Sequence, residues 1–299
     1  MKKYQLIADP EYGYLRVDPK PSKEEVENFY KEDFYTERNE SQINDSSLEI
    51  QTKDKYFFDS RWNRIYDVCN SILGNLNNKK VYDIGFGFAQ ALIFYKSKGL
   101  ICSGMEPSSE AVKYAKQKGI DNVFVGDIEG DKTYENNSKQ DIVLLINVLE
   151  HLRNPANVLK QINHNLLEEE GVLVIDVPNE FNTFQEVANT ELDLKEWWIN
   201  PPGHINYFTV KSLVDLLEKT GFEIKVKESS FPMEMFLLFG EVYVGNSGTG
   251  IKCHEKRKKF EERLIKNGHK EKLYEFYEKL AELELGRQIT VYATPKKKY

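Results

Sequence analysis

The chain has 299 residues, of which 40% are hydrophobic and 30% charged, and its formal net charge is −7. These values are typical of a globular protein, and the acidic balance argues against a nucleic-acid partner, because neutralising phosphates takes clustered Lys and Arg. No apolar run approaches the ~20 residues that span a bilayer, and we read no secretory signal at the start. We therefore expect a cytoplasmic protein with no membrane partner.

The positions of the three cysteines argue against a structural zinc site. Cys69, Cys102 and Cys253 lie far apart and form no CxxC pair. Structural zinc sites built from cysteine need closely spaced pairs. We therefore expect reduced thiols, buried or partly buried, and no structural zinc.

The first 74 residues predict an extension and then a long helix. Residues 1–20 suggest an extended pair around a turn that starts at Asp9. Residues 21–35 are typical of a helix, since Ser22 with Glu25 three residues later forms a capping box. The polar residues 36–50 predict a loop, and residues 52–74 carry the broad apolar stripe of a helix packed on a sheet.

From residue 81, short apolar runs alternate with helical stretches. Helices are expected at 91–99, 109–119, 154–167 and after Thr209, and strands at 81–85, 100–106, 123–127, 141–147, 171–179, 222–227 and 287–296. This alternation predicts βαβ units on a parallel sheet. The run DIVLLIN is apolar on both faces, as a central strand should be.

Nearly sixty residues separate the last two expected strands, which is too long for a plain loop. The stretch SSFPMEMFLLFG is expected either to cover a pocket as a lid or to pack as a core helix. Residues 252–272 hold nine Lys/Arg against four Glu, so they form either a phosphate site around Lys252, His254, Lys256 and Arg257 or a solvated helix face. The expected divisions are 1–50, 51–230, 231–286 and 287–299.

Ligands of a parallel sheet bind beyond the carboxyl ends of its strands, so the residues that follow each strand are informative. The first strand leads into Asp83, Gly85 and Gly87, in a D-x-G-x-G-x-A turn. A dinucleotide fingerprint would need glycine in place of Gln90. Glycines in such a turn let the backbone approach a ligand closely, although a glycine turn alone is a weak signal.

Two acids follow the next two strands. Glu106 comes 23 residues after Asp83, where an acid commonly accepts hydrogen bonds from ribose hydroxyls, and Asp127 follows the third strand. Each acid by itself could be a helix-terminal or solvated charge. Together with the glycine turn, they predict a nucleoside-binding site.

Six segments, DIGFGFA, GMEPS, GDIE, DIVLLINVLEHLRNPANVLKQI, GVLVIDVPN and GHINYFT, resemble the successive motifs of class I S-adenosylmethionine-dependent methyltransferases. The resemblance covers roughly residues 78–228 and the final strand. It is nearest to bacterial small-molecule enzymes of sugar, surface-polysaccharide and natural-product pathways. Many of these carry a cysteine-rich zinc module before a segment like PKPSKEEVENFYKEDFY. Here the segment is present without those cysteines, so we expect the module to be either lost or replaced by the hairpin YQLIADPEYGYLRV.

The resemblance implies a Rossmann-like α/β fold. It has a seven-stranded, mostly parallel sheet with an antiparallel last strand, an N-terminal extension and a helical insert before the last strand. It also implies S-adenosylmethionine as the cofactor. Its methionine part would lie on Asp83, Gly85 and Gly87, its ribose on Glu106, its adenine on Asp127 and Ile128, and its sulfonium near Asn147. Ala89 departs from the usual third glycine, for which we expect a slightly altered turn rather than lost binding.

Transfer to oxygen usually needs a base, and histidine suits neutral pH. Of the five histidines, His204 follows the fifth expected strand and is favoured as base or substrate ligand. His151 is a second candidate, which could instead stabilise the turn after its strand by hydrogen bonding. Tyr207 either lines the pocket or simply packs within the protein. His164 and His269 are expected at the surface.

Three functions remain open from the sequence. The favoured one is methyl transfer to a small molecule, at an oxygen of a sugar, nucleotide-linked or surface-polysaccharide intermediate. A phosphate on that acceptor is left open. The second is a metal-assisted enzyme acting on RNA or a phenol, with Glu150, His151 and His204 as ligands. Related RNA and quinone methyltransferases of this kind carry an acid where this chain has Asn147, so no metal is expected in the favoured case. The third is a non-catalytic module that binds a cofactor or a partner. The oligomeric state does not follow.

Overall fold

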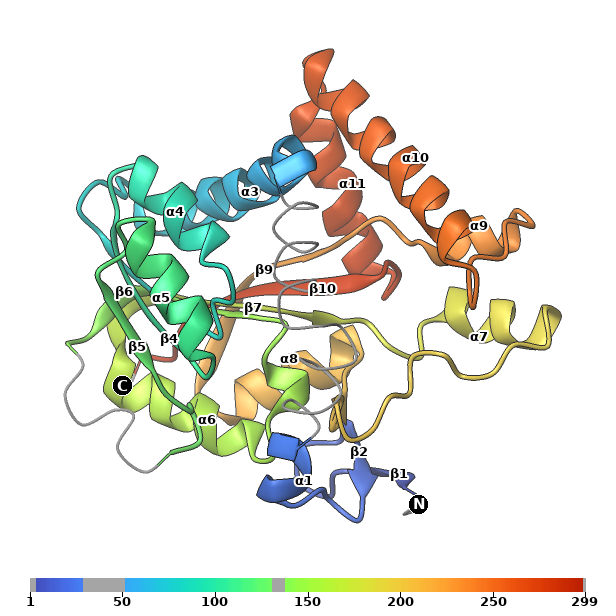
Figure 1. Cartoon of the computed structure of the whole chain (residues 1–299), viewed down its shortest axis with the longest axis horizontal. Helices are drawn as coiled ribbons and strands as arrows, with labels where there is room; N and C mark the ends of the chain where they lie inside the picture. Colours follow the sequence, from blue (N-terminus) through green and yellow to red (C-terminus); the bar gives the residue numbers. More distant parts are fainter. Residues whose placement is uncertain (1–3, 29–51, 131–137, 298–299) are drawn as a thin grey trace.

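The computed structural model describes residues 4–28, 52–130 and 138–297. Seven strands form one sheet in the order β5-β4-β3-β6-β7-β10-β9 (Figure 1). They are β5 (Asn122–Val125), β4 (Ile101–Glu106), β3 (Lys80–Ile84), β6 (Gln140–Ile146), β7 (Leu167–Pro178), β10 (Gln288–Pro295) and β9 (Phe222–Ser229). Only β10 is antiparallel to its neighbours in this sheet. The predicted Rossmann-like sheet with an antiparallel last strand is confirmed.

Helices cover both faces of the sheet because its central strands are apolar on both sides. On one face lie α3 (Lys55–Leu73), α4 (Gln90–Ser97) and α5 (Ser109–Gln117), packed on side chains such as Leu144. On the other lie α6 (Pro155–Gln161) and α8 (Val210–Lys219), packed on side chains such as Val143 and Leu145. All three strand side chains are fully buried. The face of each residue follows from the period of two along β6.

Two parts of the core differ from the sequence prediction. The helix expected at 154–167 ends as an α-helix at Gln161 and continues as a π-helical turn, Ile162–Leu166. Strand β7 follows directly at Leu167, four residues earlier than predicted. A helix that was not predicted, α7 (Thr183–Glu191), follows β7. Asn182 caps it by accepting from the amide of Gln185. The helix was missed because few apolar residues mark its buried face.

The N-terminal extension is a hairpin that joins a second, small sheet. Strands β1 (Gln5–Ala8) and β2 (Leu15–Asp18) form the predicted pair, and β2 also pairs with β8 (Asn206–Tyr207), which was not predicted. In α1 (Lys23–Asn28) the predicted capping box is present, with the Ser22 amide donating to Glu25 at 2.7 Å. The rest of that predicted helix and the loop at 36–50 lie outside the described residues.

The insert between β9 and β10 holds α9 (Glu234–Leu238), α10 (Ser247–Lys266) and α11 (Lys270–Glu282). Figure 1 shows α10 and α11 as a hairpin beside α3. The Lys258 ammonium lies 2.6 Å from the Asp54 carboxylate, which ties α10 to the residue that precedes α3. Among the described helices, none has the length and apolar character that crossing a membrane would need.

Candidate functional site

The turn after β3 has the tight backbone that its glycines predicted. Gly85, Gly87 and Ala89 all have left-handed φ angles, of 71°, 51° and 54°. A Cβ on Gly85 would lie 2.7 Å from the side chain of Val148, so only glycine fits there. A Cβ on Gly87 would meet nothing within 4 Å, so this part of the turn faces open space. The turn therefore leaves room for a ligand at the end of β3.

Glu106 and Asp83 lie together at the ends of β4 and β3. The Glu106 carboxylate accepts hydrogen bonds from the amides of Gly87 and Ser108, both at 3.0 Å. Burial raises the pKa of Glu106, while these two amides oppose the rise. Burial and the neighbouring Glu106 raise the pKa of Asp83. A buried carboxylate fixed in this way is suited to accept hydrogen bonds from a ribose diol.

Asp127 follows β5 at the same edge of the sheet, as predicted. Its Oδ1 accepts from the Glu129 amide at 3.0 Å, and its Oδ2 lies 3.1 Å from the ammonium of Lys23 in α1. Ile128 is buried in the core beside it. The N-terminal extension therefore reaches the predicted adenine end of the site, which the sequence did not indicate.

Asn147, directly after β6, has a special backbone conformation and is held by two hydrogen bonds. It has a left-handed φ of 55°, its amide donates to the Asp176 carbonyl, and its Oδ1 accepts from Gln288 at 3.1 Å. Arg61 of α3 lies 2.8 Å from the Asp176 carboxylate. Sequence reasoning missed Arg61, Asp176 and Gln288, because their meeting depends on the β7–β10 register and on how α3 packs.

The second group of predicted residues also comes together. A 3-10 turn, Leu149–His151, follows β6 and carries Glu150 and His151 toward His204. One possible ligand atom from each of these three residues lies within 4.8 Å of the other two. The His151 and His204 rings meet edge to face with centroids 5.0 Å apart. The Nδ1 of His151 is 2.7 Å from the Gly203 carbonyl, which favours the tautomer with the proton on Nδ1.

Burial sets the protonation of this cluster. It raises the pKa of Glu150 to about 8 and, together with the charges of His151 and Arg287, lowers that of His204 to about 4. Burial also lowers the pKa of His151. Both imidazoles are therefore neutral at neutral pH. A neutral imidazole can accept a proton or bind a metal ion, so the cluster can do either.

The loop that carries His204 is held by backbone contacts. The Ile205 amide donates to the Glu150 carbonyl at 2.9 Å, and the Ile205 carbonyl accepts from Val17 of the hairpin at 3.0 Å. Asn206 donates to the carbonyls of residues 149 and 152. The Tyr207 hydroxyl donates to the His204 carbonyl and is buried, which matches the packing alternative for this residue.

The remaining sequence candidates lie elsewhere. His164 and His269 are exposed, as expected. In the basic stretch of α10, Lys256 pairs with Glu241 and Arg257 with Glu261. His254 lies 3.8 Å from Asp54 and contacts Phe57 edge to face. Lys252 and Lys256 are exposed, as on a solvated helix face, whereas His254 and Arg257 are half-buried, and the phosphate alternative stays a prediction.

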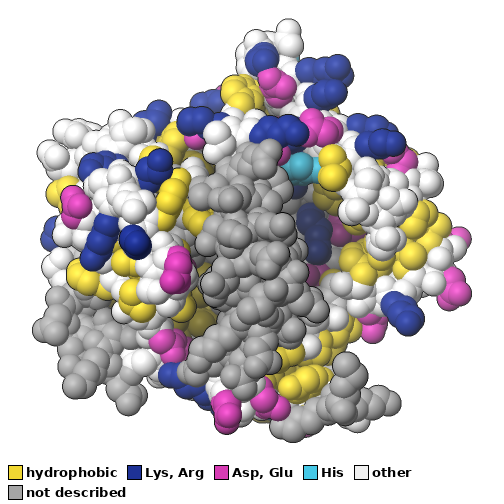
Figure 2. Space-filling view, viewed as in Figure 1, with side chains coloured by type: hydrophobic (Ala, Val, Ile, Leu, Met, Phe, Trp, Pro, Cys, Tyr) yellow, Lys and Arg dark blue, Asp and Glu magenta, His cyan; other side chains and the backbone are white. Residues whose placement is uncertain are grey.

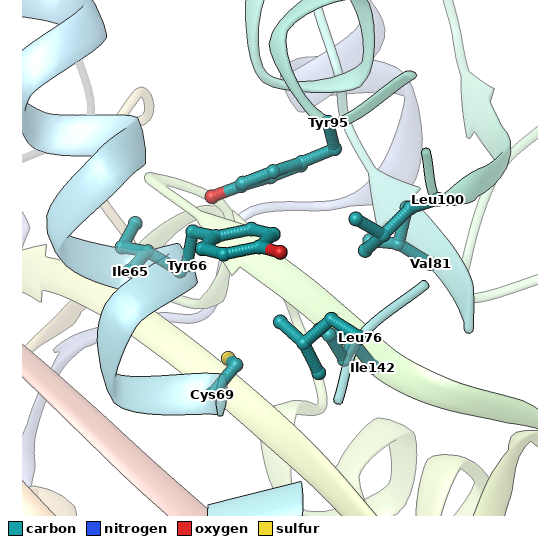
Figure 3. A pocket seen from close by; sticks show the side chains of 8 residues that line it. All are labelled: Ile65, Tyr66, Cys69, Leu76, Val81, Tyr95, Leu100 and Ile142. Carbon is teal, nitrogen blue, oxygen red and sulfur yellow. The ribbon is translucent and has the colours of Figure 1, made fainter. Parts of the chain in front are cut away.

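A hollow at the opposite edge of the sheet carries no candidate chemistry. Figure 3 shows it between α3 and the start of the strands, near the amino ends of β3 and β6. It is lined by Ile65, Tyr66, Cys69, Leu76, Val81, Tyr95, Leu100 and Ile142. No charged side chain lines it, and it lies away from the strand ends described above.

Comparisons with known proteins agree with this geometry. The pattern of the methyltransferase domain family matches residues 58–226. The chain is 30% identical over 127 residues to a ubiquinone biosynthesis O-methyltransferase of Haemophilus ducreyi, covering 40% of this chain and 52% of the relative. It is 31% identical over 150 residues to a probable (S)-tetrahydroprotoberberine N-methyltransferase 2 of Papaver bracteatum, covering 46% and 40%. The chain spans about half the length of the curated relatives it matches.

Solved structures share the fold at low identity. A SAM-dependent methyltransferase from Archaeoglobus fulgidus aligns with a TM-score of 0.51 at 19% identity, covering 83% of this chain and 99% of that one. The plantazolicin methyltransferase BamL, solved with SAH, aligns with a TM-score of 0.53 at 14% identity, covering 91% and 94%. The solved structures share the predicted fold, and the chain belongs to the methyltransferase domain family.

Proposed function

We propose that the chain transfers the methyl group of S-adenosylmethionine to an oxygen of a small-molecule acceptor in the cytoplasm. The acceptor is a sugar, nucleotide-linked or surface-polysaccharide intermediate rather than a nucleic acid or a lipid. The observation that carries the proposal is the buried Glu106 carboxylate, which the Gly87 and Ser108 amides fix at the end of β4.

The residues at the strand ends fit the cofactor. The open side of Gly87 leaves space above the turn, and Glu106 offers a carboxylate to the ribose hydroxyls. Asp83, Gly85 and Gly87 would hold the methionine part, Asp127 with Ile128 the adenine, and Asn147 the region of the sulfonium. The cofactor supplies an activated methyl group, so the protein has to align the acceptor and exclude water.

His204 is our candidate base. Its imidazole is neutral at neutral pH, so it can take the proton of an acceptor hydroxyl. Its lowered pKa makes it a weak base by itself. The Glu150 carboxyl group lies within the same 4.8 Å cluster and offsets the imidazolium charge when ionised. His151, held by the Gly203 carbonyl, packs against His204 and orients its ring.

A metal-assisted enzyme acting on a phenol is the second candidate, favoured by the same cluster. Two imidazoles and a carboxylate are a common ligand set for zinc and other transition metals. No described residue donates a hydrogen bond to the Oε2 of Glu150, although this oxygen is buried. A relative named for ubiquinone biosynthesis adds support. Full activity after exhaustive chelation rules this candidate out, whereas loss that a divalent ion restores supports it.

The decisive experiment for the function is a methyl-transfer screen with labelled S-adenosylmethionine. Its panel pairs nucleotide sugars and surface-polysaccharide intermediates with catechols. Turnover of the sugars favours the first proposal, and turnover of catechols the second. Tight cofactor binding without turnover of any acceptor favours the non-catalytic module. Glu106→Ala serves as the cofactor-site control, since it should remove turnover of every acceptor.

A further inference from the structure

Arg287, directly before β10, is held by two buried acids that contact two of its three guanidinium nitrogens. Its Nη1 is 3.2 Å from Glu180, which follows β7, and its Nε is 3.7 Å from Glu234 of α9. No residue in the described part of the chain contacts its Nη2 at hydrogen-bond distance. The Arg287 side chain is 29% exposed, whereas the two acids are 2% and 0% exposed. Each donor edge of the guanidinium, Nε with Nη2 and Nη1 with Nη2, therefore has one nitrogen beside an acid, and Nη2 keeps its donors for a ligand.

The open guanidinium belongs to the acceptor side of the site. Its neighbour Gln288 donates to Asn147, the residue expected near the sulfonium. On the other side, the charge of Arg287 acts on His204. Arg287 therefore lies near the Asn147 end of the site, in the region that we expect an acceptor to enter.

In this region the arginine side chains are more exposed than the acidic side chains that pair with them. Arg61 repeats the arrangement, since it is 28% exposed and its partner Asp176 is 5% exposed. Burial raises the pKa of Glu234, while the neighbouring Arg287 charge lowers it. Figure 2 shows basic and acidic side chains together in the hollow beside the grey segment. A ligand that enters here meets guanidinium groups before carboxylates.

We infer that Arg287 binds an anionic group of the acceptor, a carboxylate or a phosphate, through the Nη2 donors of its guanidinium. The inference rests on the proposed function and names the chemistry that its acceptor must carry. Arginine suits this role because its planar donors match carboxylate and phosphate oxygens. The two glutamates hold the side chain in place, so little side-chain entropy is lost on binding.

Three variants and a control separate binding from structure. Arg287→Gln removes the charge, and Arg287→Lys keeps it without the planar donors. Glu234→Gln has nearly the same shape as the native residue and removes a carboxylate that competes for Arg287, so it should strengthen anion binding. Opposite effects at Arg287 and Glu234 are not expected of a purely structural pair. Arg263→Gln, at an exposed position of α10, is the matched control.

The measurement is binding of three probes, glucose, glucuronate and glucose 6-phosphate, to the full chain loaded with S-adenosylhomocysteine. We expect one of the two anions to bind at least about tenfold more tightly than glucose, as one charge-assisted contact allows. The tighter anion tells a carboxylate site from a phosphate site. Arg287→Gln should remove the preference, Arg287→Lys weaken it, and Arg263→Gln leave it unchanged.

Either of two results overturns the inference: equal binding of all three probes to the wild type, including no binding at all, or an anion preference that survives Arg287→Gln. Should Arg287→Gln not fold, unchanged or weaker anion binding by Glu234→Gln overturns it as well. Failure to bind S-adenosylhomocysteine counts instead against the proposed function, and the probes are then titrated without it.

Discussion

The Glu106 carboxylate accepts a hydrogen bond of 3.0 Å from the Gly87 amide, so the acid after β4 and the glycine turn after β3 form one unit. A ligand that contacts this acid also contacts a turn that the acid holds in shape. Because Glu106 is only 7% exposed, it is not a solvated loop charge. The alternative that the sequence allowed for it, a helix N-terminal charge, accounts for the contact with the Ser108 amide but not for the contact with the Gly87 amide.

Glu106→Ala should weaken S-adenosylmethionine binding by roughly tenfold to a hundredfold, since hydrogen bonds to a charged group contribute about 1.5–3 kcal/mol. Calorimetric titration measures the change. Glu110→Ala, at an exposed position of α5, should leave the affinity as it is in the wild type. If the two variants bind S-adenosylmethionine with equal affinity, Glu106 is not part of the cofactor site.

Ala89→Gly should stabilise the protein by about 1 kcal/mol, because a residue with a side chain pays roughly this amount for a left-handed conformation. The φ of Ala89 is 54°, and its amide donates to the Phe86 carbonyl within the same turn. Urea denaturation measures the gain, and cofactor affinity should stay the same. Ala115→Gly, inside α5, should have the opposite sign. A loss of stability in Ala89→Gly would contradict the turn geometry.

His204→Gln should lower kcat by about a hundredfold or more if its imidazole takes the acceptor's proton, as is typical of general bases. KM should change little, because the loss concerns the transition state. His164→Gln alters an exposed histidine and is the control. A kcat that stays within twofold of the wild type assigns the base to another group.

The free energy of unfolding should fall as the pH rises from about 6.5 to 8, because burial raises the pKa of Glu150 to about 8. In this window the unfolded chain has already released that proton, while the folded chain still holds it. Glu150→Gln should therefore reduce this loss and be more stable than the wild type at pH ~8. The lowered pKa values of His151 and His204 act in the opposite direction below pH ~6.5, so they do not mask the effect. Parallel pH profiles for the two proteins would contradict a raised pKa of Glu150 in the folded chain.

The mostly parallel sheet, the central place of one strand and the strand-end acids could be predicted because they depend on local patterns. The doubly apolar DIVLLIN run marks β6 as central, and the spacing of Asp83, Glu106 and Asp127 marks the cofactor edge. Ala89 illustrates the limit of such reading. The sequence shows that the third glycine is absent, but not that Ala89 adopts a glycine-like φ.

Contacts that need tertiary packing could not be predicted. The two-residue strand β8 is recognisable only through its pairing with β2, which lies nearly two hundred residues earlier. Arg287 meets Glu180 and Glu234 because α9 folds back beside the residues that follow β7. The basic stretch of α10 was predicted either to bind a phosphate or to face solvent. In the structure its Lys258 pairs with Asp54, a contact that depends on tertiary packing.

Calorimetric titration of the full chain with S-adenosylmethionine tests most directly whether the edge formed by Gly87, Glu106 and Asp127 is a cofactor site. Saturable one-to-one binding that Glu106→Ala weakens and Glu110→Ala leaves intact is the predicted result. Absence of saturable binding by the folded wild type, or binding that Glu106→Ala leaves unchanged, would contradict it.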